Sequence, residues 1–566
     1  MLKKCKLVKI IPFVLFSLTA CGGETPGNTP EPIDNDEDQQ TIVEQDPCAG
    51  DPVYTGQDVN VSKIVHNDHG YHISVNDKDF LFLGTQIRVD AFMNCDHYTY
   101  ADVRNLFKEA SLLGVNCVEI PVEWSKVEIA ENVYDYKYVH EMIHYAEEFN
   151  LKVEFNWFGS NMCGDTHSYS VPNYIIADGK TYPKFDASRT GEFWNYYGIM
   201  WFLDFDNPNL IARERLAVRK FMDYIYEYDS THGCKNTVIG IQVENEVDIF
   251  PRWRIEQQAV VDPLTGVKMS QEVGFNKVVK LVDEIGKEIK QSKYKVYTRV
   301  NLASSTQGAI YSGDEVRDVP AFAKLFNNLE GIDIIGDDTY SSSVKNIKGI
   351  TAMFRDKLEH NFSHVAENDG SYSNTPSLIL ASVSQHGGYA IYDLMTSPFY
   401  IDNGTGNVNQ GIINPGSDRS NFVHTAHFDD TKALLAGLNK AESEVYKVSP
   451  DDFIAFNLAG NYPQDSVTQT ISSTNCTLEF NTSQKAIGYA LDFGEYVDVL
   501  VTNNSTIKLS NGTVTGIQRG SLSVNGFEAA ETLNISDTIS LTGGEFYRIS
   551  YTSNGKIAST TWTNIG

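Results

Sequence analysis

Apolar residues recur along most of the chain at two spacings, one typical of helices and one typical of strands. A helix is predicted over residues 99–113, where the apolar positions fall on one face: Val103, Leu106, Phe107 and Ala110. The same pattern returns over residues 137–149 and 278–289. Short apolar runs separate these helices, and this alternation is typical of parallel α/β folds.

The apolar runs predict eight strands, the number that a closed barrel needs. Their predicted ends lie near Arg88, Trp124, Trp157, Glu246, Asn301, Tyr340, Glu367 and Phe399. A doubly wound open sheet is the alternative, but no glycine-rich phosphate-binding loop follows any of these runs. The fold class predicted for residues 53–450 is therefore α/β, a (β/α)8 TIM barrel.

After about residue 450 the helical spacing disappears. Short alternating runs such as Val497–Val501 follow, and Asn511 and Gly512 suit a tight hairpin turn. These features predict a C-terminal antiparallel β-sandwich domain over residues 451–566. It is expected to pack on the barrel as an accessory domain, or to bind carbohydrate.

The N-terminus has the pattern of an export signal. Lysines at positions 3, 4, 6 and 9 precede the apolar run Ile10–Leu18, which is too short to span a bilayer. The sequence Leu-Thr-Ala before Cys21 resembles the bacterial lipobox, so residues 1–21 are predicted to be a lipoprotein signal peptide with Cys21 lipidated. An ordinary signal peptide with an incidental cysteine is the alternative.

Residues 22–52 contain many acidic residues, several prolines and no Lys or Arg, so a disordered acidic tether is predicted. An acidic stretch after a lipidated cysteine resembles the surface-export signals of some Bacteroidetes-type lipoproteins, although a solvated spacer explains it equally. The predicted location is the bacterial outer membrane or cell surface, and the predicted membrane contact is the lipid anchor alone.

The charge balance excludes one class of partner. The 566-residue chain has a formal net charge of −29 and no basic stripe, so it would repel nucleic acid. Hydrophobic residues make up 41% of the chain, which is enough to bury a sizeable core. The cysteines after the signal show no CxxC and no metal-ligand spacing, so no metal and no other cofactor is expected.

One predicted strand starts at Val238 and runs into Glu244, Asn245 and Glu246. Charged side chains at the edge of a buried strand are costly and need a reason, although a loop of solvated acids would also contain them. The carboxyl ends of barrel strands are where such barrels form active sites. Hydrolysis of a glycosidic bond needs two carboxyl groups at such a place, one protonated and one ionised.

The segment Gln242–Glu246 resembles the Q-x-E-N-E motif of clan A glycoside hydrolases, especially the β-galactosidase-like families 35 and 42. This resemblance implies that Glu246 is the general acid/base and that Asn245 binds the hydroxyl next to the anomeric carbon. Glu244 lies two residues before Glu246, so strand alternation would aim it to the same side, and it is expected to support the substrate site.

Further segments resemble the same families in the same order, and together they cover roughly residues 80–402: 84–90, 121–136, 156–174 and 332–340. They imply that Arg88, Trp124 and Trp157 contact substrate, since indole rings stack well on sugars. A structural role is the alternative for Arg88 and Trp157. Tyr340 is expected to touch the nucleophile.

Two segments compete for the seventh strand, which should carry the nucleophile. Residues 362–370 are weakly apolar but contain Glu367, whereas residues 377–382 are more apolar and contain no carboxylate. If residues 374–386 form the seventh helix and 389–399 the eighth strand, Glu367 lies in the nucleophile position. If not, the second carboxylate is missing and the protein would only bind sugar.

The sequence therefore predicts a retaining β-glycoside hydrolase, β-galactosidase-like and exo-acting, whose partner is an oligo- or polysaccharide. Glu367 and Glu246 would work by double displacement with water as the second substrate. The alternatives are a surface glycan-binding lipoprotein with a degenerate barrel, and an endo-acting β-glucanase or mannanase. Asp165 and His167, in the loop after the third strand, are not catalytic candidates.

Overall fold

A computed structural model describes most of the chain from residue 56 onward. The described residues are 56–161, 170–187, 193–195, 198–200, 202–255, 259–262, 265–303, 318–397, 411–458, 465–470, 476–482, 485–523 and 526–553. The predicted signal peptide with Cys21, the acidic tether, Asp165, His167 and Phe399 lie outside them.

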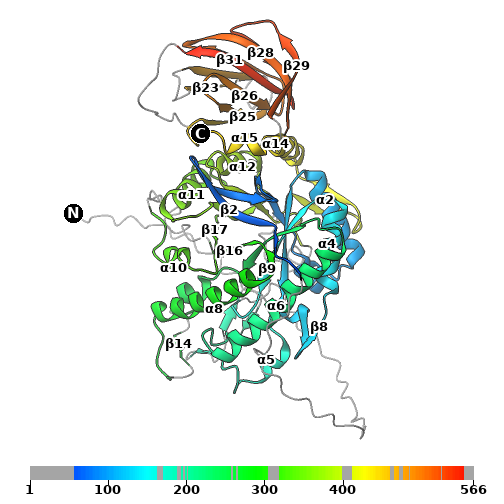
Figure 1. The fold of residues 1–566 in the computed structure, drawn as a ribbon, viewed down its shortest axis with the longest axis vertical. Coiled ribbons are helices and arrows are strands. Elements are labelled where there is room, and N and C mark those ends of the chain that lie inside the picture. Colours follow the sequence, from blue (N-terminus) through cyan, green and yellow to red (C-terminus); the bar gives the residue numbers. More distant parts are fainter. Residues whose placement is uncertain are drawn as a thin grey trace, which may run out of the picture.

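Eight parallel strands close into a barrel in chain order, which confirms the predicted (β/α)8 fold (Figure 1). They are β5 (Leu83–Gln86), β6 (Cys117–Glu123), β9 (Lys152–Phe158), β13 (Val238–Val243), β16 (Tyr297–Leu302), β17 (Ile334–Asp338), β18 (His364–Asp369) and β19 (Gly388–Tyr392). The eighth strand ends at Tyr392, earlier than the predicted Phe399. Beyond it the backbone at Leu394 and Thr396 exchanges hydrogen bonds with Ile413 instead.

A helix follows each strand and covers the outside of the barrel. These helices are α2 (Tyr100–Leu113), α4 (Lys137–Glu148), α6 (Pro208–Thr231), α8 (Gln271–Gln291), α10 (Ala323–Asn327), α11 (Val344–Lys357), α12 (Thr375–Val383) and α14 (Phe428–Lys440). Helix α2 begins after Thr99, which forms a capping box with Asp102. It ends at Gly114, whose φ of 94° gives it the left-handed conformation of a C-cap. The helices predicted over residues 99–113 and 137–149 are confirmed, and α12 lies within the predicted 374–386.

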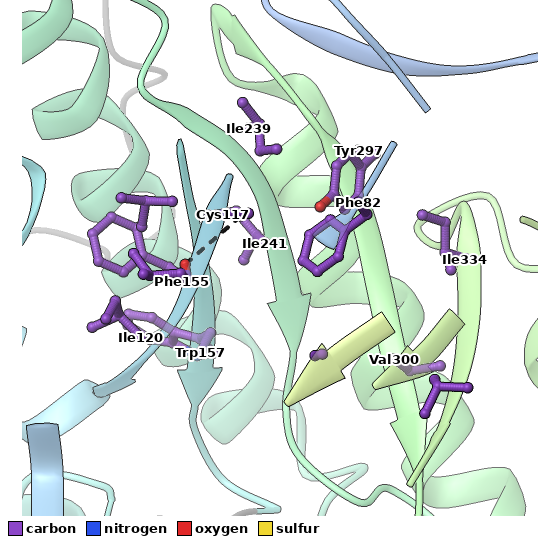
Figure 2. Close-up of a cluster of buried hydrophobic side chains, with 14 of the residues drawn as sticks. Phe82, Cys117, Ile120, Phe155, Trp157, Ile239, Ile241, Tyr297, Val300 and Ile334 are labelled. Carbon is purple, nitrogen blue, oxygen red and sulfur yellow. Dashed lines mark hydrogen bonds between the residues drawn. The ribbon is translucent and has the colours of Figure 1, made fainter. Parts of the chain in front are cut away.

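Apolar side chains fill the layer between the strands and these helices, and some aromatic rings, such as that of Tyr297 whose hydroxyl donates to Glu154, lie inside the barrel (Figure 2). On β9, the side chains of Phe155 and Trp157 both point outward. Their ring centroids lie 5.5 and 5.4 Å from that of Phe221 on α6. Successive residues of a strand point to opposite faces, so Glu154 and Asn156 point into the barrel. The helix layer is therefore the apolar core, and the barrel interior carries polar groups.

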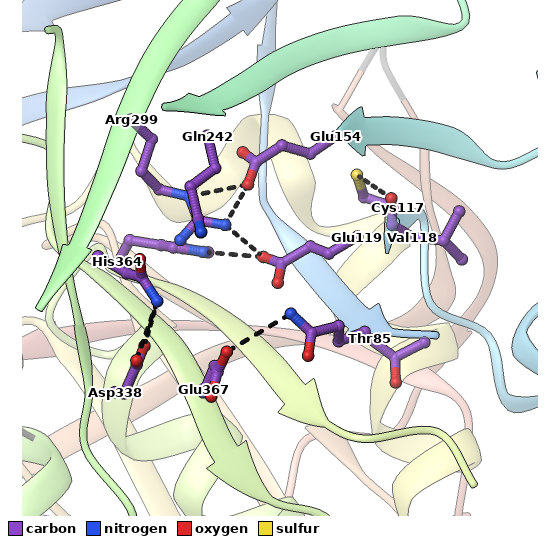
Figure 3. Close-up of polar contacts among 12 residues, drawn as sticks. Thr85, Cys117, Val118, Glu119, Glu154, Gln242, Arg299, Asp338, His364 and Glu367 are labelled. Carbon is purple, nitrogen blue, oxygen red and sulfur yellow. Dashed lines mark hydrogen bonds and ion pairs between the residues drawn. The ribbon is translucent and has the colours of Figure 1, made fainter. Parts of the chain in front are cut away.

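A charged cluster occupies the barrel interior, where apolar layers are usual (Figure 3). Arg299 Nε donates to Glu154 Oε1 at 2.8 Å, and Arg299 Nη2 lies 3.1 Å from Glu119 Oε1. His364 Nε2 lies 3.3 Å from the same Glu119 oxygen. Burial raises the pKa of Glu119 to about 7, and burial with the charge of Arg299 lowers the pKa of His364 to about 3. Loss of one partner from such a buried pair costs about 3–5 kcal/mol.

A small antiparallel sheet covers the amino-terminal end of the barrel. It consists of β2 (Ser62–Asn67), β3 (Gly70–Val75) and β4 (Lys78–Phe80). Ser62 Oγ donates to the carbonyl of Ile239 and accepts from the Tyr297 amide at 3.0 Å, so it caps the starts of β13 and β16. The opposite, carboxyl end of the strands is the open mouth of the barrel.

The C-terminal strands form two antiparallel sheets around a second apolar core, which confirms the predicted sandwich. The six-stranded sheet contains β22 (Phe453–Leu458), β25 (Ala486–Asp492), β26 (Tyr496–Val501), β31 (Phe546–Ser553), β28 (Gly512–Ser523) and β29 (Gly526–Leu533). The four-stranded sheet contains β23 (Asp465–Thr470), β24 (Thr477–Thr482), β27 (Ser505–Ser510) and β30 (Thr538–Leu541).

The sandwich contacts the barrel through α12 and α14, on the side away from the mouth. In Figure 1 it lies at the opposite end of the molecule from α5 (Asn173–Ala177) and β14 (Val260–Val261), which follow β9 and β13. Its described strands therefore do not line the mouth. Its predicted role in glycan binding stays a prediction.

Two further features bear on the sequence predictions. Across the described ranges, no helix combines the length and the apolar character needed to cross a membrane. The cysteines in those ranges are free thiols: Cys95, Cys117, Cys234 and Cys476.

Candidate active site

The carboxyl end of β13 forms a tight turn that carries two glutamates. The strand ends at Val243, and Glu244 and Glu246 have φ values of 63° and 44°, in the left-handed region. For side chains other than Gly, this conformation costs about 1–3 kcal/mol at each position and persists only where the surroundings enforce it. The turn is therefore held by specific contacts.

Side-chain amides hold this turn from below. Gln242 Nε2 donates to the Glu244 carbonyl and to Asn245 Oδ1, both at 2.8 Å. Asn301, at the end of β16, accepts from the Glu246 amide at 2.9 Å and donates to Asn245 Oδ1 at 3.0 Å. The side-chain amides of Gln242 and Asn301 thus fix the conformation of the turn, so the Asn245 and Glu246 side chains extend from it in defined directions.

Glu246 is half-buried and lies among negative charges. Burial raises the pKa of Glu246 well above its usual range, and the charges of Glu367 and Asp248 raise it further. Arg88 and Arg254 lower it only in part. This setting favours the protonated form of the carboxyl group, which is the state a general acid needs.

Glu367 lies near the end of β18 and is only 7% exposed. The Tyr340 hydroxyl donates to its Oε2, and Gln86 Nε2 lies 3.5 Å from its Oε1. Burial raises the pKa of Glu367 to about 7, while the Tyr340 hydrogen bond and the charge of Arg88 restrain the rise. Arg88 therefore compensates both glutamates, whereas the hydrogen bond from Tyr340 is given to Glu367.

Asp338 is a third buried carboxyl group at the mouth. It ends β17 and is the register partner of Glu367. Asn301 Nδ2 donates to its two oxygens at 3.2 and 2.9 Å. Burial and the charges of Glu367 and Glu246 raise the pKa of Asp338 well above its usual range. The mouth therefore retains protons at neutral pH, because its carboxyl groups repel one another.

Arg88 supplies positive charge to the mouth. Its guanidinium binds Asp90 in a bidentate manner at 3.0 and 2.7 Å, and Nη1 donates to the Tyr392 hydroxyl at 3.0 Å. Its charge lowers the pKa of both Glu246 and Glu367, and its contact with substrate stays a prediction. Because Asp90 already shares its charge, Arg88 compensates the glutamates only partly.

Trp124 and Trp157, which were predicted to contact substrate, do not present their rings to the mouth. Both are fully buried. Trp157 Nε1 donates to Glu214 on α6 at 3.0 Å, because strand alternation turns the ring outward to the helix layer. Trp124 Nε1 donates to Glu128 at 2.9 Å. Their placement corrects the prediction, and both rings have structural roles.

Glu244 is likewise not a substrate ligand. Its carboxyl group is fully buried and accepts from the backbone amides of Gly159 and Asn161 at 3.0 and 3.3 Å. The alternation argument that aimed it to the side of Glu246 is wrong, because the strand ends at Val243 and the left-handed turn redirects the chain. Its supporting role acts on the backbone instead.

Three residues of the site were missed: Asn301, Asp338 and Glu214. Asn301 and Asp338 follow apolar runs, and polar residues at such ends were the available signal. Glu214 falls on the buried face of α6 with Leu210, Ala217 and Phe221, so an acid on an apolar helical stripe could have identified it. What it contacts depends on tertiary structure.

A separate cavity of about 180 Å³ opens beside the mouth. It is lined by Val89, Asp90, Met93, Asn94, Tyr100, Pro121, Glu123, Lys126, Ile129, Asp135 and Tyr138. Of the mouth residues described above, Asp90 is among the lining residues of this cavity, and Glu246 and Glu367 are not. No group of three or more His, Cys, Asp or Glu side chains in the described part of the chain is arranged to hold a metal ion.

One protein-family model matches part of the chain, and its description names no activity. A family model described as a domain of unknown function (DUF4978) matches residues 277–463, which include Glu367 but not Glu246. No curated protein matches the sequence.

Solved structures with some likeness include three glycosidases. An exo-β-1,4-mannosidase from Opitutaceae bacterium strain TAV5 is 12% identical, with a TM-score of 0.43 over 68% of this chain and 63% of that chain. A β-glucosidase from Exiguobacterium antarcticum B7 is 12% identical, with a TM-score of 0.40 over 63% of this chain and 98% of the other. A β-galactosidase from Marinomonas ef1 is 11% identical, with a TM-score of 0.44 over 65% and 62%. The chain thus spans less than two thirds of the mannosidase, and likeness this low assigns neither substrate nor mechanism.

Proposed function

We propose that this protein is a retaining β-glycoside hydrolase with Glu246 as general acid/base and Glu367 as nucleophile. The observation that carries the proposal is the pairing of these two carboxyl groups at the ends of β13 and β18. They interact strongly enough that the charge of Glu367 is the next influence after burial on the pKa of Glu246. Two glutamates whose surroundings differ in this way match the acid and nucleophile roles.

The reaction would proceed in two steps. Glu367 attacks the anomeric carbon while Glu246 gives its proton to the departing glycosidic oxygen, which leaves a glycosyl ester on Glu367. Glu246, now ionised, takes a proton from water as the water oxygen attacks the same carbon and releases Glu367. Tyr340 holds Glu367 Oε2, which leaves Oε1 as the attacking oxygen. The resemblance to families 35 and 42 supports exo action on a β-galactoside-like sugar and a hydroxyl contact for Asn245.

The rival interpretation, a barrel that only binds glycans, required Glu367 to lie away from Glu246. It loses its main support because both groups occupy the same mouth. An endo-acting glucanase or mannanase has the same pair and differs only in the shape of the substrate cleft. No described residue favours it over exo action.

Hydrolysis of a panel of nitrophenyl β-glycosides and oligosaccharides tests the proposal, with azide rescue to assign roles. Azide added to Glu367→Ala should give a glycosyl azide of inverted configuration, whereas Glu246→Ala should give the retained one. Exposed Glu131 offers a matched control, Glu131→Gln, that should keep the wild-type rate. Equal rates for wild type and both alanine variants would refute the assignment.

We also propose that the protein is exported and anchored to the membrane through lipid on Cys21. The charged start, the short apolar run and the lipobox-like sequence support this location. Labelled palmitate should be incorporated by the wild-type chain and not by Cys21→Ala. Equal labelling of the two would exclude the anchor.

A further inference from the structure

Two buried carboxyl groups meet behind the turn that carries Glu246. Glu214 of α6 and Glu244 are both fully buried. They occupy the space left by the missing side chain of Gly159: a Cβ there would overlap Glu214 Oε1 and lie 2.6 Å from Glu244 Oε1. Two ionised carboxylates this close and this deeply buried would repel each other strongly. The pair must therefore hold a proton.

Hydrogen-bond donors around the pair show which group is ionised. Glu214 Oε1 accepts from Trp157 Nε1 at 3.0 Å, and Glu214 Oε2 accepts from the Ser160 amide at 3.3 Å and from its hydroxyl. Both oxygens of Glu214 thus act as acceptors, as an ionised carboxylate does.

Glu244 shows the other pattern. Its Oε2 accepts the two backbone amides of Gly159 and Asn161, but no donor in the described part of the chain reaches its buried Oε1. A buried acceptor without a donor is unfavourable. If Glu244 Oε1 carries a proton, it becomes a donor itself and no longer lacks a hydrogen-bond partner.

We propose that Glu244 is protonated on Oε1 and donates to Glu214 Oε1, and that this pair is a positioning clamp for the turn that presents Asn245 and Glu246. One proton is shared between two carboxyl groups, so the pair has a net charge of −1. The inference rests on the proposed function, because it deepens the account of how the acid/base is held.

The clamp reaches the catalytic turn through short contacts. Glu244 is the first left-handed residue of the turn, and its side chain fastens that residue to the backbone after β9. Asn161 adds a second tie, since its Nδ2 donates to the Asn245 carbonyl at 2.9 Å. Release of Glu244 would remove the carboxyl tie on the β9 side and leave the turn held by the side-chain amides of Asn161, Gln242 and Asn301.

The charges around the pair agree with this protonation state. Burial and the negative charge of Glu214 raise the pKa of Glu244 well above its ordinary value of 4.5. Among the described residues of β9 and the segment after it, the Trp157 indole, the Gly159 and Asn161 amides and Ser160 face the pair, and all of them are uncharged. On α6, the neighbouring Arg213 turns away and pairs with Glu128 instead. No cation among the described contacts of Glu244 offsets a second negative charge.

Glutamine substitution distinguishes the two members. Gln at position 244 mimics a protonated Glu, with an amide N–H toward Glu214 and a carbonyl toward Gly159 and Asn161. Glu244→Gln should therefore keep kcat and KM within about twofold, whereas Glu244→Ala should lower kcat by about 100-fold through misplacement of the acid. Glu214→Gln should be more harmful than Glu244→Gln, because its N–H would oppose the Trp157 or Ser160 donors.

A second measurement requires no substrate. The folded-state pKa of Glu244 is raised, so the wild type must lose stability as the pH rises above about 4.5, where the unfolded chain releases this proton and the folded chain does not. Glu244→Gln lacks this group, so its melting temperature should fall less steeply with pH and exceed that of wild type at pH 7. The control Glu131→Gln should follow the wild-type slope.

The outcomes separate the clamp from the glycosidase assignment. If no glycoside is hydrolysed but the melting curves differ as described, the clamp stands and the proposed function fails. Parallel pH slopes for wild type and Glu244→Gln, or a Glu244→Gln variant as unstable as Glu244→Ala, would overturn the clamp whatever the activity.

Discussion

The ends of β13 and β18 each place a glutamate at the barrel mouth, but by different means. β18 continues through Glu367 to Asp369. Its register against β17 and β19 shifts beside Glu367, but the Glu367 carbonyl accepts from the Thr339 amide at 3.0 Å, which holds the backbone of that residue against β17. β13 stops at Val243, and Glu246 stands in a left-handed turn held by side-chain amides. A nucleophile must be fixed relative to the anomeric carbon, whereas the acid must reach out to a leaving oxygen. The two strand ends suit these different tasks.

The electrostatic surroundings differ in the same sense. Glu367 receives a hydroxyl hydrogen bond from Tyr340, which favours its ionised form, while the charge of Arg88 lowers the pKa of both glutamates. Glu246 faces the negative charges of Glu367 and Asp248, which favour its protonated form. The proposed distinction between acid and nucleophile therefore rests on neighbouring residues, because the two side chains are chemically identical.

The largest effect is expected from removal of the nucleophile. Glu367→Gln should lower kcat on the order of 10⁴-fold or more for every substrate, since it removes the proposed nucleophile. Glu246→Gln should lose as much with unactivated oligosaccharides and far less with nitrophenyl glycosides, whose leaving groups need no proton. The ratio of rates on the two substrate classes measures the difference. Equal losses for Glu246→Gln on both classes would contradict its role as acid.

A smaller effect is expected at Asn245. Asn245→Ala should lower kcat/KM by roughly 10²–10³-fold, because hydrogen bonds to the sugar hydroxyl strengthen in the transition state. The fold should remain, although Gln242 and Asn301 lose one partner each. Circular dichroism and melting curves check this point. A variant with an unchanged rate and an unchanged melting curve would show that the motif match is coincidental.

The barrel and the two strand ends could be predicted because they depend on local pattern. Apolar runs of strand length alternate with amphipathic helical segments along the chain. Counting these runs in order placed Glu367 on the seventh strand. Glu246 followed because active sites of this fold form where strands end. Which side chains of a strand point into the barrel could not be predicted in this way. Trp157 differs from Glu154 and Asn156 by alternation alone, and the sequence does not state which set points inward.

The contacts that hold the site could not be predicted from local pattern. The left-handed turn at Glu244 and Glu246 has no glycine to announce it, and it exists because Gln242, Asn161 and Asn301 enforce it. Glu214 reaches Glu244 only after α6 packs on β9. Pairs of residues brought together by packing require the structure.

Substitution of Tyr340 tests whether its hydrogen bond to Glu367 accounts for the different electrostatic surroundings of the two glutamates. Glu367 must be ionised to attack, so kcat/KM should rise with pH through its pKa of about 7 and fall again where Glu246 loses its proton. Tyr340→Phe removes a hydrogen bond to the ionised form, worth about 1.5–3 kcal/mol, so the acidic limb should move up by about one pH unit or more. The alkaline limb should move less. Tyr71→Phe, on the amino-terminal sheet, is the control, and an acidic limb that stays in place would show that Tyr340 does not compensate Glu367.

The smallest effect on activity is expected from the two buried tryptophans, which lie outside the mouth. Trp157→Phe removes the hydrogen bond to Glu214 and part of the packing on Phe221, so it should lower the free energy of unfolding by about 1–3 kcal/mol. KM for the best substrate should change by less than about twofold, because a fully buried ring cannot lose a contact with a sugar. Trp124→Phe should behave alike, since its indole also donates to a buried glutamate. Melting curves and KM measured on the same preparations separate packing from binding. A tenfold rise in KM with an unchanged melting temperature would return Trp157 to the substrate site and would mean that the β9 side opens when substrate binds.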